Sequence, residues 1–336
     1  MIEQTLFTDL EIKDIINYYY DIKVKSIKKI DKGSGNLFII CGEKQDFILK
    51  EFQSSYNKQD IEREYNLIKC LNADNTYEYI LTKDKECCFL HKDKVCVLLK
   101  YIKGKEYTNN TLDIKTLKKV ATLHAEITKK LNIKREFDTF EIFCTNEKIN
   151  KNKAYMLDKI NQSTTSKTEE NIINDYKVKI NIINSLDLDK IFDFLNKNIK
   201  TINCHGDYSV QQLIFDKEKI YVLDFASFRK LPISWEIIRS YSYGDESCKN
   251  GEIDIDNLIE YIESFTEIYK LSLEEIVCMP IIYLLQLLSS NYGYKQYFNS
   301  KLTDLLNFAN FRTRLCENIF KNLQYLENAL YNHFSR

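Results

Sequence analysis

This sequence of 336 residues has almost no net charge, no apolar run long enough to span a membrane, and no CxxC pair of cysteines. Its 48 basic and 49 acidic residues leave a formal net charge of −1, so no overall field would draw the protein to nucleic acid or to an anionic membrane. The longest apolar run, residues 278–288, is well short of the roughly 18–20 residues that a membrane-spanning helix requires. We therefore expect no nucleic-acid or membrane partner, and a buried helix at this run.

The ten cysteines include no CxxC spacing, which speaks against a zinc or dithiol site. The first residues, MIEQTLFTDLEIKDII, are mixed and acidic and do not resemble a secretory leader, so we expect a cytoplasmic protein with reduced, inert thiols. Glycine (8) and proline (2) are scarce along the whole chain, which we attribute to biased base composition. With 44% apolar and 29% charged residues, the composition is typical of a globular protein.

The N-terminal third has the pattern of a small β-rich domain. Residues 24–52 predict three antiparallel strands, VKSIKKI, LFIIC and FILKEF, joined by the turns DKGSGN and GEKQD. A helix is predicted over residues 60–71 from its apolar spacing. Two further strands, CCFLHK and KVCVLLKYI, lead to Gly104. We expect a five-stranded sheet with one helix.

After Gly104 the sequence changes to long amphipathic helical segments, including the lysine-rich stretch 145–200. Only residues 201–224 return to short strands, and the chain beyond Trp235 is again helical. The predicted organisation is an α+β protein with an N-terminal lobe at residues 1–99, a hinge at 100–104, and a mainly helical C-terminal lobe at 105–336 that contains the loops of residues 201–228.

The stretch CHGDYSVQQLIFDKEKIYVLDFASF, residues 204–228, carries the strongest chemical signal. Asp207 follows His-Gly, and Asp224 ends an apolar strand; we expect both aspartates at strand ends on the same side of a hairpin. Asp224 and the amide of Gln212 would hold a divalent cation, and the carboxylate of Asp207 would orient an alcohol and accept its proton. This arrangement indicates phosphoryl transfer.

These residues resemble the catalytic and metal loops of the aminoglycoside phosphotransferase and choline kinase superfamily, whose pattern is His-Gly-Asp, four residues, Asn and a later Asp. The resemblance implies a two-lobed protein-kinase-like fold with a small antiparallel-sheet N-lobe. It also implies that Glu236 takes the place of an aspartate that supports the catalytic loop, and that His205 ties this loop through hydrogen bonds.

The resemblance extends to the nucleotide site of the N-terminal lobe. It implies that Lys50, on the third strand, contacts the phosphates and pairs with Glu64 on the following helix. The glycine turn would cover the phosphates or be a plain hairpin turn, and backbone groups at the hinge would bind adenine. The residues implied for the turn and the hinge are Gly33, Ser34, Gly35, Lys100 and Ile102.

Two departures from the family pattern leave two functions open. Gln212 stands where the family has Asn, and Ala226 stands where it often has a second acidic residue. The first hypothesis is a small-molecule kinase that uses ATP or GTP with Mg²⁺ and phosphorylates an alcohol group. The alternative is a non-catalytic or weakly active kinase-fold protein, such as a spore-coat-type component.

The acceptor is the least determined part of the sequence. Residues 245–275 carry ten acidic and two basic side chains, which would suit a cationic acceptor such as an aminoglycoside, an amino alcohol or choline, or would be a solvated surface. Four aromatic residues would form a cage for a quaternary amine or would pack in the core. They are Tyr292, Tyr294, Tyr297 and Phe298. The sequence fixes neither the oligomeric state nor the choice between ATP and GTP.

Overall fold

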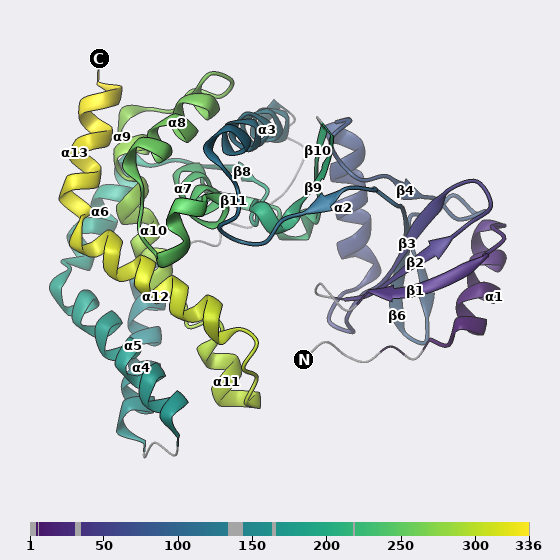
Figure 1. Ribbon diagram of the computed structural model, residues 1–336, viewed down its shortest axis with the longest axis horizontal. Helices are drawn as coiled ribbons and strands as arrows, with labels where there is room; N and C mark the ends of the chain where they lie inside the picture. Colours follow the sequence, from purple (N-terminus) through teal and green to yellow (C-terminus); the bar gives the residue numbers. More distant parts are fainter. Residues whose placement is uncertain are drawn as a thin grey trace. The chain divides into compact units, whose positions relative to one another are not determined.

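The computed structural model describes residues 5, 7–30, 35–133, 144–162, 166–217 and 219–335. The chain forms two compact units, which are described separately. Unit 1 comprises Met1–Glu106 and Gln212–Ser227, and unit 2 comprises Tyr107–Gln211 and Phe228–Arg336. An antiparallel sheet dominates unit 1 and helices dominate unit 2 (Figure 1), which confirms the predicted α+β class.

The sheet of unit 1 runs in the order β1-β2-β3-β6-β4, with β5 also paired to β6, and every pairing is antiparallel. The first three strands and their antiparallel pairing confirm the prediction. The expected five strands are in fact six, because the two-residue strand β4 shows no alternation of its own. The strands are β1 (Ser26–Ile30), β2 (Asn36–Cys41), β3 (Asp46–Glu51), β4 (Tyr79–Ile80), β5 (Phe89–His91) and β6 (Lys94–Lys100).

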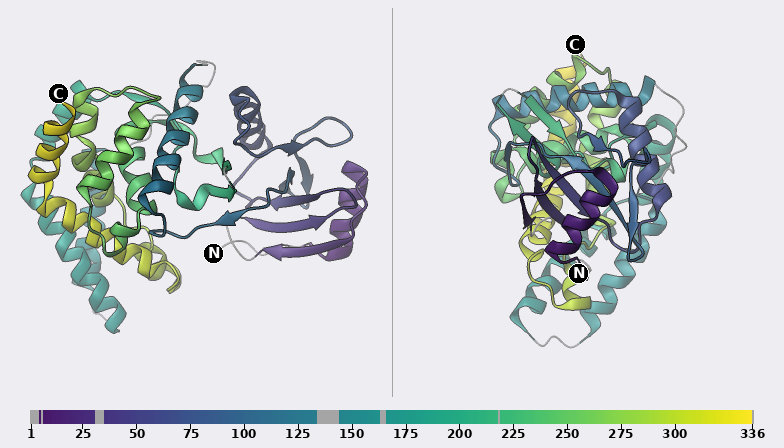
Figure 2. Two further views of the ribbon diagram at one scale, coloured as in Figure 1. Left: turned by 45° about the horizontal axis from the view of Figure 1, so that its top comes forward. Right: turned by 90° about the vertical axis from the view of Figure 1, so that its right-hand side faces the viewer.

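Among the described residues before Glu106, unit 1 has two α-helices, not one. Helix α2 (Lys58–Leu71) confirms the predicted helix, whereas α1 (Asp9–Tyr20) was not predicted. Thr8 and Glu11 form a capping box at the start of α1. The buried face of α1 packs on one face of the sheet (Figure 2), in a core made by Ile12, Ile15, Ile16, Tyr20, Phe38, Ile40, Phe47 and Leu49, among others.

The hairpin of β9 (Leu213–Asp216) and β10 (Lys219–Val222) was assigned to the C-terminal lobe but packs in unit 1. Strand β7 (Lys105–Glu106) pairs with β9. On the other side, the backbone N–H of Val222 donates to the Asn75 carbonyl at 2.7 Å, and the Asn75 amide donates to the Ile220 carbonyl at 3.0 Å. These contacts are distant in the sequence, which explains why local patterns did not predict them.

Unit 2 contains the remaining helices and one small sheet. Strand β8 (Thr201–Cys204) pairs with β11 (Arg229–Pro232) and not with the β9–β10 hairpin. The sequence predicts that Asp207 and Asp224 lie at strand ends of one hairpin. This prediction is wrong, because the strands before the two aspartates belong to different sheets. The helices are α3 (Ile114–Ile133), α4 (Asn146–Asn161), α5 (Lys167–Ser185), α6 (Leu188–Asn198), α7 (Ile233–Gly244), α8 (Ile255–Thr266), α9 (Leu273–Val277), α10 (Met279–Leu288), α11 (Tyr294–Ser300), α12 (Leu306–Lys321) and α13 (Leu323–Phe334).

Helix α10 forms the centre of unit 2. Nearly all of its residues are buried, and it packs against α7, α12 and α13. This confirms the buried helix predicted from the longest apolar run. Across the described ranges, no helix combines the length and apolarity needed to cross a membrane. The ten cysteines are free thiols, eight of them buried.

The packing of α1 gives a stability prediction. Ile16→Ala removes a fully buried side chain from the core of unit 1, so the free energy of unfolding should fall by about 2–5 kcal/mol. Leu10→Ala on the same helix is the control, because Leu10 is 74% exposed and its loss should change stability by less than about 0.5 kcal/mol. Urea titration followed by circular dichroism measures both. Equal effects of the two substitutions would contradict the packing of α1 on the sheet.

Candidate active site

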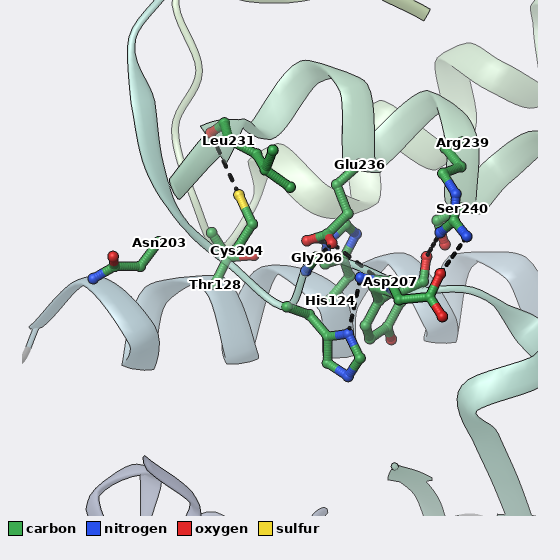
Figure 3. A network of polar contacts seen from close by, with 12 residues as sticks. His124, Thr128, Asn203, Cys204, Gly206, Asp207, Leu231, Glu236, Arg239 and Ser240 are labelled. Atoms are coloured by element: carbon green, nitrogen blue, oxygen red, sulfur yellow. Dashed lines mark hydrogen bonds and ion pairs between the residues drawn. The ribbon is translucent and has the colours of Figure 1, made fainter. Parts of the chain in front are cut away.

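The loop that follows β8 carries Asp207 and is held by a carboxylate of α7. Oε1 of Glu236 accepts hydrogen bonds from the backbone N–H of Gly206 at 2.6 Å and of Tyr208 at 3.4 Å (Figure 3). Gly206 has a φ of 85°. Glycine adopts this conformation without strain, whereas most other residues are strained in it. Glu236 is fully buried in the first turn of α7, where the helix dipole also favours a negative charge.

His124 of α3 completes the support of this loop. Its Nε2 lies 3.1 Å from Oε2 of Glu236, and its ring stacks on Tyr208 with centroids 4.1 Å apart. Nδ1 of His124 is buried without a partner, so Nε2 carries the proton and donates to Glu236. This hydrogen bond replaces part of the hydration that the buried carboxylate of Glu236 loses.

Burial shifts the proton equilibria of this pair. Burial lowers the pKa of His124 below its ordinary value of 6.5, because the charged ring would lose its hydration. Burial acts to raise the pKa of Glu236, but the hydrogen bonds from His124 and the Tyr208 backbone lower it below 4.5. The pair is therefore a neutral imidazole that donates to a carboxylate.

The side chain of Asp207 is oriented by Arg239 of α7. Nη2 of Arg239 donates to Oδ1 of Asp207, and Nη1 donates to the Tyr208 carbonyl at 3.4 Å (Figure 3). The guanidinium also lies over the rings of Trp235 and Tyr243, at 5.4 and 4.8 Å from their centroids. Burial acts to lower the pKa of Arg239, but the charge of Asp207 raises it overall, so the guanidinium stays charged.

Arg239 is a site residue that the sequence analysis missed. It lies three positions after Glu236 on α7, so both side chains share one face of the helix. This three-residue spacing is the sequence signal that could have identified Arg239 as a neighbour of Glu236. Asp207 remains 35% exposed beside the 14% exposed Arg239, so its carboxylate is accessible in unit 2.

In unit 1, Lys50 and Asp224 lie beside each other. Lys50 is on β3, opposite Leu37 of β2 and Val97 of β6. Its Nζ is 3.9 Å from Oδ1 of Asp224, and the two side chains are 15% and 31% exposed. Asp224 has a φ of 56°, which sets a tight turn between β10 and the short helix η2 (Phe225–Ser227). A lysine and a carboxylate are thus placed together where the sequence predicts phosphate and metal binding.

Glu64 of α2 is buried, and its Oε1 accepts a hydrogen bond from the hydroxyl of Tyr77. The same hydroxyl accepts from the backbone N–H of Phe225 at 3.4 Å. Burial, with the nearby charge of Glu64, raises the pKa of Tyr77 well above 10.0, so its hydroxyl stays protonated. The pairing of Glu64 with Lys50 stays a prediction.

The residues predicted to hold a metal supply oxygen atoms that suit magnesium. The backbone N–H of Leu223 donates to the Gln212 carbonyl at 2.8 Å, so Gln212 lies next to the turn of Asp224. In the part of the chain that the structure describes, no group of three or more His, Cys, Asp or Glu could hold a metal. Magnesium fits this donor set, because it is commonly held by one or two carboxylates together with water and substrate phosphates.

The other residues predicted to bind the nucleotide lie in the glycine turn and at the hinge. Gly33 and Ser34 lie outside the described residues. A Cβ on Gly35 would lie 2.7 Å from the Glu51 carbonyl oxygen, so glycine here lets two strands approach closely. The backbone N–H of Lys100 donates to the Glu78 carbonyl at 2.9 Å, and this N–H is already used within the unit. Ile102 lies outside regular strands, and binding of adenine by its backbone stays a prediction.

The structure bears on both acceptor predictions. Tyr294 and Tyr297 are 1% and 7% exposed, and the Tyr294 hydroxyl bonds to Asp175. These two residues pack in unit 2, which fits the packing alternative. In the acidic stretch, Glu260 pairs with Lys118 at 3.0 Å. Part of the negative charge of residues 245–275 is therefore compensated.

The His124–Glu236 pair predicts a pH dependence of stability. Both groups have a lowered pKa in the folded state, so the unfolded state binds more protons and acidification destabilises the fold. As the pH falls below 6.5, the free energy of unfolding should decrease by up to about 1.4 kcal/mol per pH unit for the proton of His124. His124→Gln should remove this slope.

Urea midpoints between about pH 5 and pH 7.5 measure the slope. His333→Gln is the control, because His333 is 43% exposed and pairs with Glu263 on the surface. An unchanged slope in His124→Gln would show that another group causes the acid sensitivity.

Comparison with known proteins agrees with this fold. The model of the phosphotransferase enzyme family matches residues 26–254. A spectinomycin phosphotransferase, solved with ADP and spectinomycin, is 12% identical, with a TM-score of 0.69 over 96% of this chain and 99% of that chain. An aminoglycoside phosphotransferase from Alicyclobacillus acidocaldarius is 13% identical, with a TM-score of 0.65 over 97% and 98%. Choline kinase LicA from Streptococcus pneumoniae is 15% identical, with a TM-score of 0.59 over 93% and 99%.

No curated protein sequence matches this chain. At these low identities the structural similarities establish the fold alone, whereas the family model covers more than half of the sequence, including the loops of Asp207 and Asp224. The fold is the kinase-like fold that the sequence resemblance implied. The chain belongs to the phosphotransferase enzyme family.

Proposed function

We propose that the protein transfers the γ-phosphoryl group of ATP or GTP to a hydroxyl of a small molecule. The observation that carries this proposal is the placement of Lys50 Nζ at 3.9 Å from Asp224 Oδ1, both partly exposed. A lysine next to an accessible carboxylate suits a nucleotide whose phosphates contact the amine and whose metal contacts the carboxylate. The family match supports the same reaction class.

The residues of unit 1 would bind and orient the donor. Lys50 would contact the α and β phosphates, and the oxygens of Asp224 and Gln212 would hold magnesium. When bound, this ion offsets negative charge on the β and γ phosphates. The tight turn at Asp224 keeps the carboxylate in a fixed direction. Such positioning and charge neutralisation account for most of the rate of phosphoryl transfer, because the protein does little covalent chemistry.

Asp207 of unit 2 would orient the acceptor. Arg239 holds one oxygen of its carboxylate and thereby fixes the plane of the group. The carboxylate would accept the proton of the acceptor hydroxyl while the hydroxyl oxygen forms the new bond to the γ phosphorus. The bond from phosphorus to the bridging oxygen breaks, and the nucleoside diphosphate leaves.

Asp207, Asp224 and Lys50 favour this proposal over a non-catalytic kinase-fold protein. Each of the three side chains is partly exposed. Partly exposed charged groups contribute little to the stability of a fold, so stability alone does not require them there. The substitutions Gln212 and Ala226 would then adjust the metal site rather than abolish it.

The donor site is tested by calorimetric titration with ATP and with GTP, each with and without magnesium. The wild type should bind at least one nucleotide, and Asp224→Asn should lose the part of the affinity that depends on magnesium, because the amide has no negative charge. Asp216→Asn is the control, since Asp216 is an exposed aspartate of the same hairpin. If the folded wild type binds neither nucleotide, a non-catalytic function is correct, and the reversion Gln212→Asn should be tried first.

The role of Asp207 is tested by phosphate transfer from the preferred nucleotide to a panel of aminoglycosides, amino alcohols and sugars. Asp207→Ala should lower turnover by roughly 10²- to 10⁴-fold, the usual contribution of a positioned general base, and should leave nucleotide affinity nearly unchanged. Asp193→Asn, on the exposed side of α6, should behave as the wild type. Near-normal turnover of Asp207→Ala would refute the assignment.

A further inference from the structure

One hydroxyl group joins two parts of unit 1 that are far apart in the sequence. The Tyr77 hydroxyl donates to the Glu64 carboxylate on α2 and accepts from the backbone N–H of Phe225, the residue after Asp224. Tyr77 and Glu64 are each 5% exposed. A buried carboxylate needs hydrogen-bond donors to offset its lost hydration, so the contact of Glu64 with Tyr77 is energetically important.

The second bond of Tyr77 acts on the direction of Asp224. The peptide group between Asp224 and Phe225 is planar, so a hydrogen bond to the Phe225 N–H fixes the orientation of this plane. Asp224 already has the constrained φ of 56°. The hydrogen bond from Phe225 also holds the peptide plane that follows Asp224. The position of the Asp224 side chain therefore depends on the Tyr77 hydroxyl.

The segment before Tyr77 is attached to the strand that leads into Asp224. Asn75 exchanges hydrogen bonds with Ile220 and Val222 of β10, and Thr76 forms a parallel bridge with Val222. The ring of Tyr77 lies 6.4 Å from that of Phe225. Residues 75–77 therefore follow β10 into the turn, and Tyr77 is the point at which this segment also contacts α2.

We propose that Tyr77 is a positioning residue that makes the orientation of Asp224 depend on Glu64, so that metal-dependent nucleotide binding requires α2 in its place. The inference rests on the proposed function for its consequence, but the contact itself is a property of the free protein. Because the hydroxyl of Tyr77 donates to Glu64, it presents its oxygen lone pairs to the Phe225 N–H. A displacement of α2 would remove the partner that holds the hydroxyl in this orientation.

The test substitution is Tyr77→Phe, which keeps the ring and removes the hydroxyl. In the protein without ligand, amide hydrogen exchange should become faster in peptides covering residues 220–228, while β2 and β3 keep their protection. The magnesium concentration needed for half-maximal enhancement of nucleotide binding should rise roughly three- to tenfold, the effect of one buried hydrogen bond. Nucleotide affinity without magnesium should be unchanged.

The matched control is Tyr20→Phe, which also removes the hydroxyl of a buried tyrosine in unit 1, on α1. It should change neither exchange at residues 220–228 nor the magnesium requirement. A double-mutant cycle with Glu64→Gln adds a second measurement. If Tyr77 acts through Glu64, the two effects on the magnesium requirement should be non-additive.

The outcomes separate this inference from the proposed function. If the wild type binds no nucleotide, the proposed function fails, and exchange at residues 220–228 still decides whether Tyr77 holds the Asp224 turn. If the wild type binds nucleotide and Tyr77→Phe has an unchanged magnesium requirement, the inference is wrong. Faster exchange throughout β2 and β3 would assign Tyr77 a general structural role and would also overturn it.

Discussion

The buried carboxylate of Glu236 is the constraint on which the geometry of unit 2 depends. It accepts from two backbone N–H groups of the Asp207 loop and from His124. Removing a charge from water is expensive unless donors replace the lost hydration, and this loop provides those donors only in the observed conformation. The charge and the loop therefore stabilise each other. On the same helix, Arg239 fixes the Asp207 side chain, so α7 controls both the backbone and the carboxylate of the residue proposed to orient the acceptor.

Unit 1 follows the same physical rule with different residues. Asp224 lies beside a lysine, as Asp207 lies beside an arginine, and the backbone next to each aspartate is held by a buried acid, directly by Glu236 and through Tyr77 by Glu64. In both places a basic side chain lies close to the partly exposed carboxylate, while buried hydrogen bonds set the direction of the aspartate. The two aspartates are thus pre-oriented in the free protein, which would lower the cost of ordering the proposed site on binding of its substrates.

Local patterns predicted the parts of this structure that depend on local forces. Strand alternation predicted β1 to β3, helical spacing predicted α2, and the apolar run predicted α10. Helix α1 also had a local signal in its Thr8–Glu11 capping box, which was overlooked because the segment was read as mixed and acidic. Strand β4 is too short to show a pattern.

The residues of the candidate site also divide into those that local patterns predicted and those that they missed. The sequence predicts site roles for Asp207, Asp224 and Lys50 because they stand in a recognisable motif or at a strand position known from the family. Tyr77 and Arg239 were missed because their importance comes from contacts with residues distant in sequence, such as Phe225 for Tyr77 and Asp207 for Arg239. A single sequence contains the side chains of such contacts but not their partners.

The discontinuous composition of unit 1 has a consequence for biosynthesis. The chain leaves this unit after Glu106, returns at Gln212 and leaves again after Ser227. During translation the sheet of β1 to β6 is made early, yet the contacts of residues 75–77 with β10 and with Phe225 wait until much of unit 2 has been synthesised. Until then the Asn75 carbonyl lacks the N–H of Val222, and the Tyr77 hydroxyl lacks the N–H of Phe225. Assembly of the proposed nucleotide site is therefore a late event, coupled to the growth of the helical unit.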